Sequence, residues 1–230
     1  MDLKIKNLVL KVKNEENPIL EVENLYLKSG ENLVVTGESG AGKTTFLNLI
    51  SLLEFPTSGE IYWGNVKTST LNQTQKDRFR NLNFGIVMQN FHLIQNLSAI
   101  ENIMLLNLFS TNKPVKKELA MHLLNEVGIT NPNLKLKLYS RGQMQRIAIV
   151  RALSCAPKVL ILDEPTASLD KFNSNLITNL LTNFTNKTNA TMIVASHDET
   201  IKNSFKNILD IKKNESINWQ SNTLQTKEEK

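Results

Sequence analysis

The chain has few cysteines and few aromatic residues. A single cysteine, Cys155, excludes an internal disulfide and any cysteine-based metal cluster. Because Cys155 lies in an apolar segment, we interpret it as a core residue and not as a reactive thiol. Aromatic residues make up only 6% of the chain.

Long apolar runs are also absent. No stretch approaches the roughly 18 to 20 uninterrupted apolar residues that cross a bilayer, since Asn107 interrupts one run and Arg151 another. Residues 1–6 alternate charged and apolar side chains, which is typical of a first strand and not of the continuous apolar region of a secretory signal. We therefore expect a cytoplasmic protein.

The remaining composition is that of one soluble domain with a sizeable core: 230 residues, 40% hydrophobic and 21% charged. The net charge of +5 suits nucleotides, nucleic acid or an anionic membrane surface, or simply a solvated basic surface. The lysines form no long block and no zinc-finger spacing is present, so we expect no nucleic acid partner. We expect one domain over residues 1–220 and a polar tail over 221–230, which has no apolar period.

The first quarter of the chain has the pattern of strands and then of a helix. Residues 3–13 and 19–28 are strand-like and flank the turn at 14–18, which indicates an antiparallel hairpin. Residues 32–36 form a short valine-containing run before a glycine, as in a buried strand. Helical spacing follows over 43–53.

Helical patterns dominate residues 91–156 and predict an inserted helical subdomain. Strand patterns return at 158–162 and 191–195, with a helical pattern over 172–184 between them. This alternation predicts an α/β fold with a mainly parallel sheet, an N-terminal antiparallel β subdomain and the helical insertion.

The strongest motif begins at Gly37 and matches G-x-x-x-x-G-K-[ST] between a predicted strand and a predicted helix, the context of a phosphate-binding loop, or P-loop. Glycines let backbone N–H groups point at phosphate oxygens, and the helix adds its positive end. Lys43 is expected to bridge the β- and γ-phosphates and Thr44 to bind Mg²⁺. The alternative is a glycine-rich turn that binds nothing. The expected nucleotide-binding residues are Gly37, Glu38, Ser39, Gly40, Ala41, Gly42, Lys43, Thr44 and Thr45.

A second motif is the apolar run 159–162 ending in Asp163 and Glu164. In a parallel sheet, residues at the C-terminal ends of the strands face the ligand. Asp163 is predicted to hold Mg²⁺, and Glu164 to polarise the water that attacks the γ-phosphate. The alternative is an exposed acidic turn before Pro165.

Residues 139–146, Tyr-Ser-Arg-Gly-Gln-Met-Gln-Arg, resemble the L-S-G-G-Q-Q-Q-R signature of ATP-binding cassette (ABC) ATPases. Gln89 lies where the family has its Q-loop. Residues 168–170 resemble the family's D-loop, and His197 resembles its switch histidine. The resemblance covers about residues 3 to 215. It implies that the chain binds and hydrolyses ATP with Mg²⁺.

The resemblance also implies roles for these residues. Two ATPase domains, either two copies or a homologous pair, would pack head to tail, with ATP between the P-loop of one and the signature of the other. The signature residues would be Ser140, Arg141, Gly142 and Gln143. Glu164, His197, Gln89 and Lys43 would be catalytic, and Gln89 would join Thr44 and Asp163 at Mg²⁺. Asp170 would reach the opposite P-loop, with a helix N-cap as the alternative.

The sequence departs from the family pattern in two regions, the adenine-stacking position and the signature. The aromatic that stacks on adenine is expected near Val12, so stacking is weakened or supplied by Tyr26 or a partner chain, and we expect lower nucleotide affinity or base selectivity. Tyr139 replaces the signature leucine and Arg141 its first glycine. We expect Arg141 to turn outward or to bind the phosphate, with hydrolysis intact.

The resemblance implies separate integral membrane permease subunits, with the ATPase peripheral on the cytoplasmic face of the membrane. A groove near Phe91, Leu93 and Ile94 would receive a permease segment, although these are equally well ordinary core residues. Flanking residues look most like the lipoprotein-release, macrolide-efflux and cell-division branch, which favours export or lipoprotein or lipid release. Importer ATPases, soluble cassette ATPases of DNA repair or translation, and a signalling module that moves no cargo remain alternatives.

Overall fold

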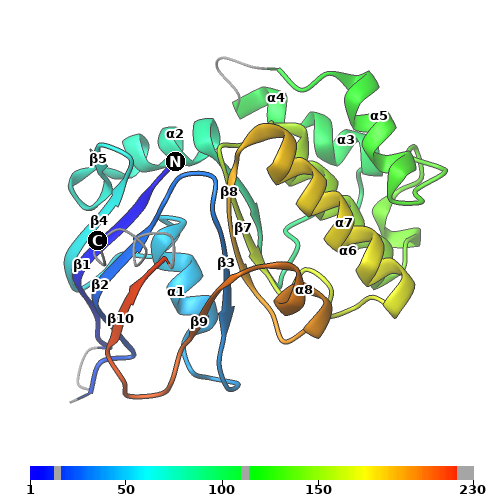
Figure 1. Cartoon of the computed structure of the whole chain (residues 1–230). Coiled ribbons are helices and arrows are strands. Elements are labelled where there is room, and N and C mark those ends of the chain that lie inside the picture. The colour runs from blue at the N-terminus through cyan, green and yellow to red at the C-terminus, as the bar shows by residue number, and fades with distance from the viewer. Residues whose placement is uncertain (13–16, 110–113, 222–230) are drawn as a thin grey trace.

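The computed structural model describes residues 1–12, 17–109 and 114–221. Figure 1 shows the β-strands of the N-terminal half beside a central sheet that carries helices on both faces. The predicted α/β class is confirmed by two five-stranded sheets. Within the described residues, no helix is both long and apolar enough to span a bilayer.

The first sheet is mainly antiparallel and contains the predicted hairpin. β1 (Leu3–Leu10) pairs antiparallel with β2 (Leu20–Leu27) and with β4 (Ser58–Trp63). β5 (Val66–Lys67) extends one edge, and β10 (Ile217–Gln220) adds parallel to β2 at the other. β1 ends earlier than residue 13, and residues 13–16 of the expected strand and turn lie outside the described residues.

The second sheet is parallel throughout, in the order β6-β7-β8-β3-β9. Its strands are β6 (Phe84–Val87), β7 (Val159–Asp163), β8 (Thr191–Ala195), β3 (Asn32–Thr36) and β9 (Asn207–Asp210). Because parallel strands end at one edge, the segments that follow β3, β7 and β8 meet there.

Side chains of the parallel strands alternate between two cores, as the pleat requires. Val35, Ile161 and Ile193 face α1 (Lys43–Ile50) and the antiparallel sheet. Val34 and Leu162 face α6 (Arg141–Ser154) and α7 (Lys171–Thr188) on the other side. The helix that follows the P-loop and the helix that begins at the signature therefore cover opposite faces of one sheet.

The helices between β6 and β7 occupy the predicted helical insertion: α3 (Ala99–Met104), α4 (Leu106–Phe109), α5 (Lys117–Glu126), the short 3-10 turn η2 (Leu136–Leu138) and α6. Segments 91–97 and 129–135 of the expected helical region are instead not helical. The other helical elements are η1 (Thr68–Thr70), α2 (Gln73–Asn83) and α8 (Glu199–Ser204).

Two local predictions need correction. α1 ends at Ile50 and not near residue 53, because Leu52 adopts a left-handed conformation with φ 62° that ends the helix. Cys155 is partly buried and not a full core residue. Burial nevertheless raises the pKa of its thiol to about 11, so it stays protonated and unreactive at neutral pH, as expected.

Candidate nucleotide site

The P-loop joins β3 to α1 through three glycines in the left-handed region. Gly37, Gly40 and Gly42 have φ of 141°, 78° and 104°, which glycine adopts without the strain of a side chain. A Cβ at Gly37 would lie 2.2 Å from the carbonyl oxygen of Ile211, so this position also excludes any side chain. α1 begins without a side-chain cap or an acid in its first turn. Its first N–H groups are therefore suited to an anion.

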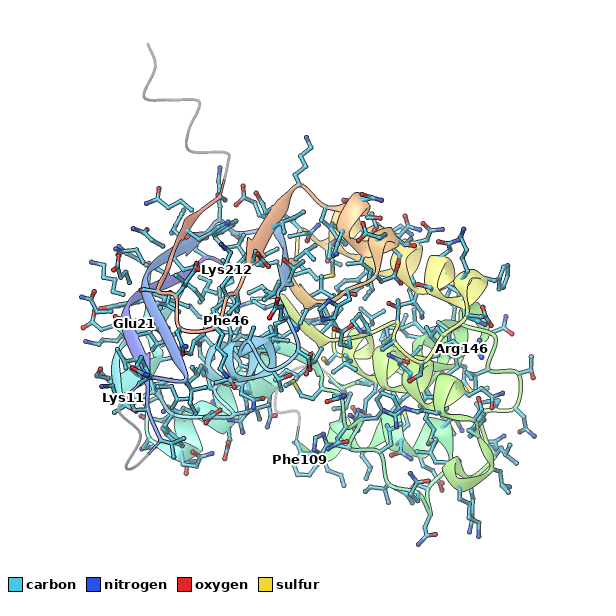
Figure 2. The ribbon with its side chains drawn as sticks, turned by 90° about the horizontal axis from the view of Figure 1, so that it is seen from below. Lys11, Glu21, Phe46, Phe109, Arg146 and Lys212 are labelled. Carbon is cyan, nitrogen blue, oxygen red and sulfur yellow. The ribbon has the colours of Figure 1, made fainter. Side chains whose placement is uncertain are left out.

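Lys43 lies folded over this loop. Its Nζ donates to the carbonyl oxygens of Gly37 at 2.7 Å and Glu38 at 2.9 Å. Glu38, Ser39 and Gly40 are exposed, whereas Ala41 is buried in the core cluster under the antiparallel sheet and α1. In Figure 2, Phe46 of α1 lies on the same side of the molecule as Glu21 of β2, and Arg146 of α6 lies on the other side.

Asp163, the last residue of β7, lies against the start of α1. Thr44 Oγ1 donates to Asp163 Oδ2 at 2.9 Å, although 119 residues separate the two in the chain. Burial raises the pKa of the Asp163 carboxyl above its ordinary value, while the Thr44 hydrogen bond and the charge of Lys43 oppose that rise. A nearly buried carboxylate next to a hydroxyl is a set of hard oxygen donors that suits Mg²⁺ together with phosphates and water.

Glu164 is held in a strained conformation opposite His197. Its φ of 49° lies in the left-handed region, which is unfavourable for glutamate. Its N–H donates to the carbonyl oxygen of Ala195 at 2.9 Å, which fixes the backbone against β8. Glu164 Oε1 and His197 Nε2 are 3.6 Å apart. Burial raises the pKa of Glu164, and the neighbouring His197 acts in the opposite direction.

The raised pKa of Glu164 predicts a dependence of stability on pH. The folded chain binds this proton more tightly than the unfolded chain, so the favourable contribution is present below the ordinary pKa and is lost as pH rises through the raised pKa. At pH 7.5 the ionised, partly buried carboxylate therefore destabilises the fold. We expect Glu164→Gln to raise the Tm of the nucleotide-free protein by about 2 to 4 °C at pH 7.5. This gain in Tm should shrink as the pH falls toward the ordinary pKa of a glutamate carboxyl.

Circular dichroism melts at several pH values test this expectation. Asp170→Asn is the matched control, because backbone and side-chain hydrogen bonds from Asn173 lower the pKa of Asp170, so neutralising it should lower the Tm. A Glu164→Gln protein that melts below the wild type at pH 7.5 contradicts the assignment.

The signature segment begins α6. Ser140 is the N-cap and its Oγ accepts from the Gln143 N–H at 3.2 Å, while Gln143 Oε1 accepts from the Ser140 N–H at 2.8 Å. A Cβ at Gly142 would meet the carbonyl oxygen of Ser168 at 3.0 Å, so the helix packs closely on the segment that precedes Asp170. Arg141 Nε donates to Ser168 Oγ at 3.0 Å. The side chain of Arg141 thus folds along this segment within its own chain.

Sequence reasoning missed Gln145 as a positioning residue. This nearly buried side chain donates from Nε2 to the carbonyl oxygen of Glu164 at 2.8 Å, and its Oε1 accepts from the Ser168 N–H at 3.2 Å. It ties α6 to the backbone at both ends of the loop after β7. A polar residue inside a polar helical stretch gave no signal that it faces inward, since burial depends on how the helix packs.

The structure brings some predicted residues together and leaves others apart. Lys43, Thr44, Asp163, Glu164 and His197 share one edge of the parallel sheet. Gln89 follows β6 at that edge and is exposed, without a hydrogen bond among the described residues.

The residues predicted to act across a dimer have partners within their own chain. Asp170 caps α7 by accepting from the Asn173 N–H at 2.8 Å, as the N-cap alternative required. The signature residues at the start of α6 contact the segment around Ser168, and in the described part of the chain they form no hydrogen bond with the P-loop.

Of the residues expected to contribute to adenine stacking, Val12 lies near the P-loop. Ile19 donates its N–H to the Leu10 carbonyl, and the Ile19 carbonyl oxygen would lie 3.6 Å from a Cβ at Gly42, so this end of the hairpin adjoins the P-loop. Val12, two residues beyond Leu10, is 45% exposed near that end.

Tyr26 is excluded as the stacking residue. Six residues along β2 from Leu20 place it about 20 Å away from the P-loop end. The three residues predicted to line the permease groove differ in burial. Phe91 and Leu93 pack partly against the helical core, and Ile94 is 50% exposed.

Comparisons with known proteins agree with this geometry. The model of the ABC transporter family matches residues 20–167. The lipoprotein-releasing system ATP-binding protein LolD of Buchnera aphidicola is 34% identical over 208 residues, covering 88% of this chain and 90% of that protein. The macrolide export ATP-binding/permease protein MacB of Rhodopirellula baltica is 32% identical over 210 residues, covering 88% of this chain and 30% of that longer protein.

Among solved structures, the ATP-binding cassette MJ0796 in a dimeric post-hydrolysis state bound to ADP and Pi superposes with a TM-score of 0.85. It shares 31% identity, and the alignment covers 94% of this chain and 97% of that one. MJ0796 comes from Methanocaldococcus jannaschii. The resemblance inferred from the signature and the P-loop is confirmed: the chain belongs to the ABC transporter family and is an ATP-binding ATPase of the LolD and MacB type.

Proposed function

We propose that this chain is the ATPase subunit that energises a separate integral membrane permease in export or in lipoprotein or lipid release. The observation that carries the proposal is the convergence of Lys43, Thr44, Asp163, Glu164 and His197 at one edge of the parallel sheet. The names of the LolD and MacB relatives support the transport direction and cargo class.

Nucleotide binding rests on the P-loop. Backbone N–H groups at residues 37–45 bind the phosphates, and Lys43 exchanges its two carbonyl partners for phosphate oxygens, a stronger charge-assisted interaction. Thr44 and Asp163 would hold Mg²⁺, with Gln89 at its periphery, and their oxygens fit that ion. When bound, Mg²⁺ neutralises phosphate charge during transfer.

Hydrolysis rests on Glu164. As a general base it accepts a proton from water while the water oxygen bonds to the γ-phosphorus and the bond between that phosphorus and the β–γ bridging oxygen breaks, giving ADP and phosphate. The raised pKa of Glu164 improves it as a base. His197, 3.6 Å away, orients the carboxylate and contacts the γ-phosphate.

The active unit is a head-to-tail dimer of two copies, or of this chain and a homologue. Ser140, Gly142 and Gln143 begin a helix on the opposite sheet face from α1, so they meet a γ-phosphate only when a second domain supplies it. The dimeric MJ0796 cassettes support this arrangement. Asp170 would contact the partner's P-loop while it caps α7.

The last part of the proposal concerns the domain bounds and the side of the chain that faces the permease. Residues 1–220 form the single ATPase domain, and the helical subdomain of residues 91–156, together with segment 89–97, faces the permease. The chain is peripheral on the cytoplasmic face of the membrane. The polar tail of residues 221–230 has no assigned role.

A pull-down with tagged Glu164→Gln protein from detergent-solubilised native membranes, with ATP and Mg²⁺, tests this function. We expect a polytopic membrane protein in the eluate, identified by mass spectrometry, and its loss in a Lys43→Ala control that does not bind ATP. The topology of that partner separates export or release from import.

Recovery of soluble proteins or nucleic acid alone, with the ATP-bound dimer intact, would remove the permease from the proposal. That result would leave a soluble or signalling ABC ATPase that moves no cargo.

A further inference from the structure

A hollow of about 470 Å³ lies between the end of α2, α4 and the loop before β7. Small-molecule sites have volumes of about 300 to 1,000 Å³, so the hollow is large enough for a ligand. Much of its wall is apolar and comes from Leu82, Phe84, Leu106, Phe109 and Val115. Two of these side chains are poorly covered by the protein, since Leu82 is 39% and Phe109 is 65% exposed. Apolar surface is therefore available to an occupant.

This hollow and the nucleotide site lie at opposite edges of the parallel sheet. Phe84 begins β6 and Lys158 directly precedes β7, whereas Asp163 ends β7. The length of β7 separates the two edges by about 16 Å. Figure 1 shows α2 and α4 together at the top of the view, where the strands β6 and β7 begin. An occupant of the hollow would therefore lie apart from ATP.

Hydrogen bonds between several elements hold the wall in place. The side chain of Asn107 on α4 donates to the carbonyl oxygen of Val115 at 3.1 Å and accepts from its N–H at 2.6 Å. On the other side, the N–H of Lys158 donates to the carbonyl oxygen of Asn83 at 2.9 Å. A wall that is already fixed reduces the entropy that a ligand loses by ordering it.

Lys158 is the only charged residue among those that line the hollow. In the described part of the chain it forms no ion pair. The negative ends of α2 and α6 also lie here, but their carbonyl oxygens already accept hydrogen bonds from Asn83 Nδ2, Ser154 Oγ and Cys155 Sγ. The ammonium of Lys158 therefore remains for an anionic group from outside the chain.

We infer that the hollow binds a small amphiphilic anion, a carboxylate on a short alkyl chain. The carboxylate would pair with Lys158, and the alkyl chain would lie against Leu106 and Phe109. A single ammonium matches the single charge of a carboxylate better than the double charge of a phosphate monoester. Binding there requires neither a permease nor ATP hydrolysis, so it is independent of the proposed function.

Cys155 provides a reporter for this site, because it is the only cysteine of the chain and lines the hollow. Octanoate is the probe, with 1-octanol and octylammonium as its neutral and cationic counterparts. Isothermal titration calorimetry measures the three affinities. At ten times its Kd, octanoate should slow the alkylation of Cys155 by N-ethylmaleimide by about tenfold. Mass spectrometry at pH 8.5 measures that rate, since burial raises the pKa of the thiol to about 11 and thiolate is scarce at lower pH.

Charge reversal tests the role of the ammonium. We expect Lys158→Glu to weaken octanoate binding by about tenfold or more, to leave 1-octanol binding unchanged and to favour octylammonium over octanoate. Lys4→Glu, the same charge change at an exposed site on β1, should alter none of the three affinities. Leu106→Trp adds bulk to the wall and should weaken all three ligands, and its Tm shows whether the fold is kept.

Several results would overturn the assignment. Octanoate that does not bind, or that binds without slowing the alkylation of Cys155, does not occupy the hollow. Equal affinities for octanoate and octylammonium in the wild type would remove Lys158 as the anion partner. Competitive displacement of octanoate by ATP would place it at the P-loop instead. All of these measurements use the isolated full chain, so their outcome is separate from that of the permease pull-down.

Discussion

Lys43→Ala is expected to abolish measurable ATP hydrolysis and to weaken ATP binding by about tenfold or more, which corresponds to about 1.4 kcal/mol. The carbonyl oxygens of Gly37 and Glu38 hold the ammonium of Lys43 over the P-loop, where it is positioned to bind the phosphates. Phosphate release assays and titration with a fluorescent ATP analogue measure the two effects.

Lys4→Ala is the matched control, because it removes the same charge from an exposed position on β1. Its turnover should equal that of the wild type. The Tm of Lys43→Ala should also stay within a few degrees of the wild type, which separates loss of the site from loss of the fold. Turnover preserved in Lys43→Ala would remove the P-loop from the mechanism.

Glu164→Gln is expected to reduce turnover by about 100-fold or more while ATP binding is retained, because positioned general bases contribute about 10² to 10⁴. Glutamine keeps the shape and the left-handed backbone of Glu164 but cannot accept the water proton. With hydrolysis blocked, the ATP-bound head-to-tail dimer should accumulate, and size-exclusion chromatography with ATP and Mg²⁺ should show it.

Two controls test this variant: one replaces ATP by ADP, and the other moves the substitution to a different glutamate. ADP should leave Glu164→Gln monomeric, since the signature residues of a second copy would lack the γ-phosphate. Glu23→Gln, an exposed glutamate on β2, should hydrolyse ATP normally and form no lasting dimer. Full turnover in Glu164→Gln would mean that another group takes the proton, and the assignment of Glu164 as base would be wrong.

The local motifs were predictable because their chemistry depends on short-range geometry. The P-loop needs glycines at set intervals and a helix directly after them, and both are properties of consecutive residues. The apolar run that ends in Asp163 and Glu164 is predictable for the same reason, since a fully buried parallel strand has few other patterns. The N-cap at Asp170 likewise follows from the residues next to it.

Contacts between distant segments were not predictable. Thr44 and Asp163 are 119 residues apart and meet because β3 and β7 both flank β8 in one parallel sheet. The inward orientation of Gln145 depends on the packing of α6 on the loop after β7. Tyr26 was a candidate for adenine stacking by residue type alone, and the direction of β2 carries it to the wrong end of the strand.

The sequence by itself therefore determined the family, the phosphate-binding loop, the order of the motifs and the parallel α/β class, because each of these is encoded in neighbouring residues and their period. Only the tertiary structure decided the partners of the long side chains. Arg141 spans from α6 to Ser168 and Phe91, and such a side chain contacts whichever surfaces the packing of distant elements brings within its reach.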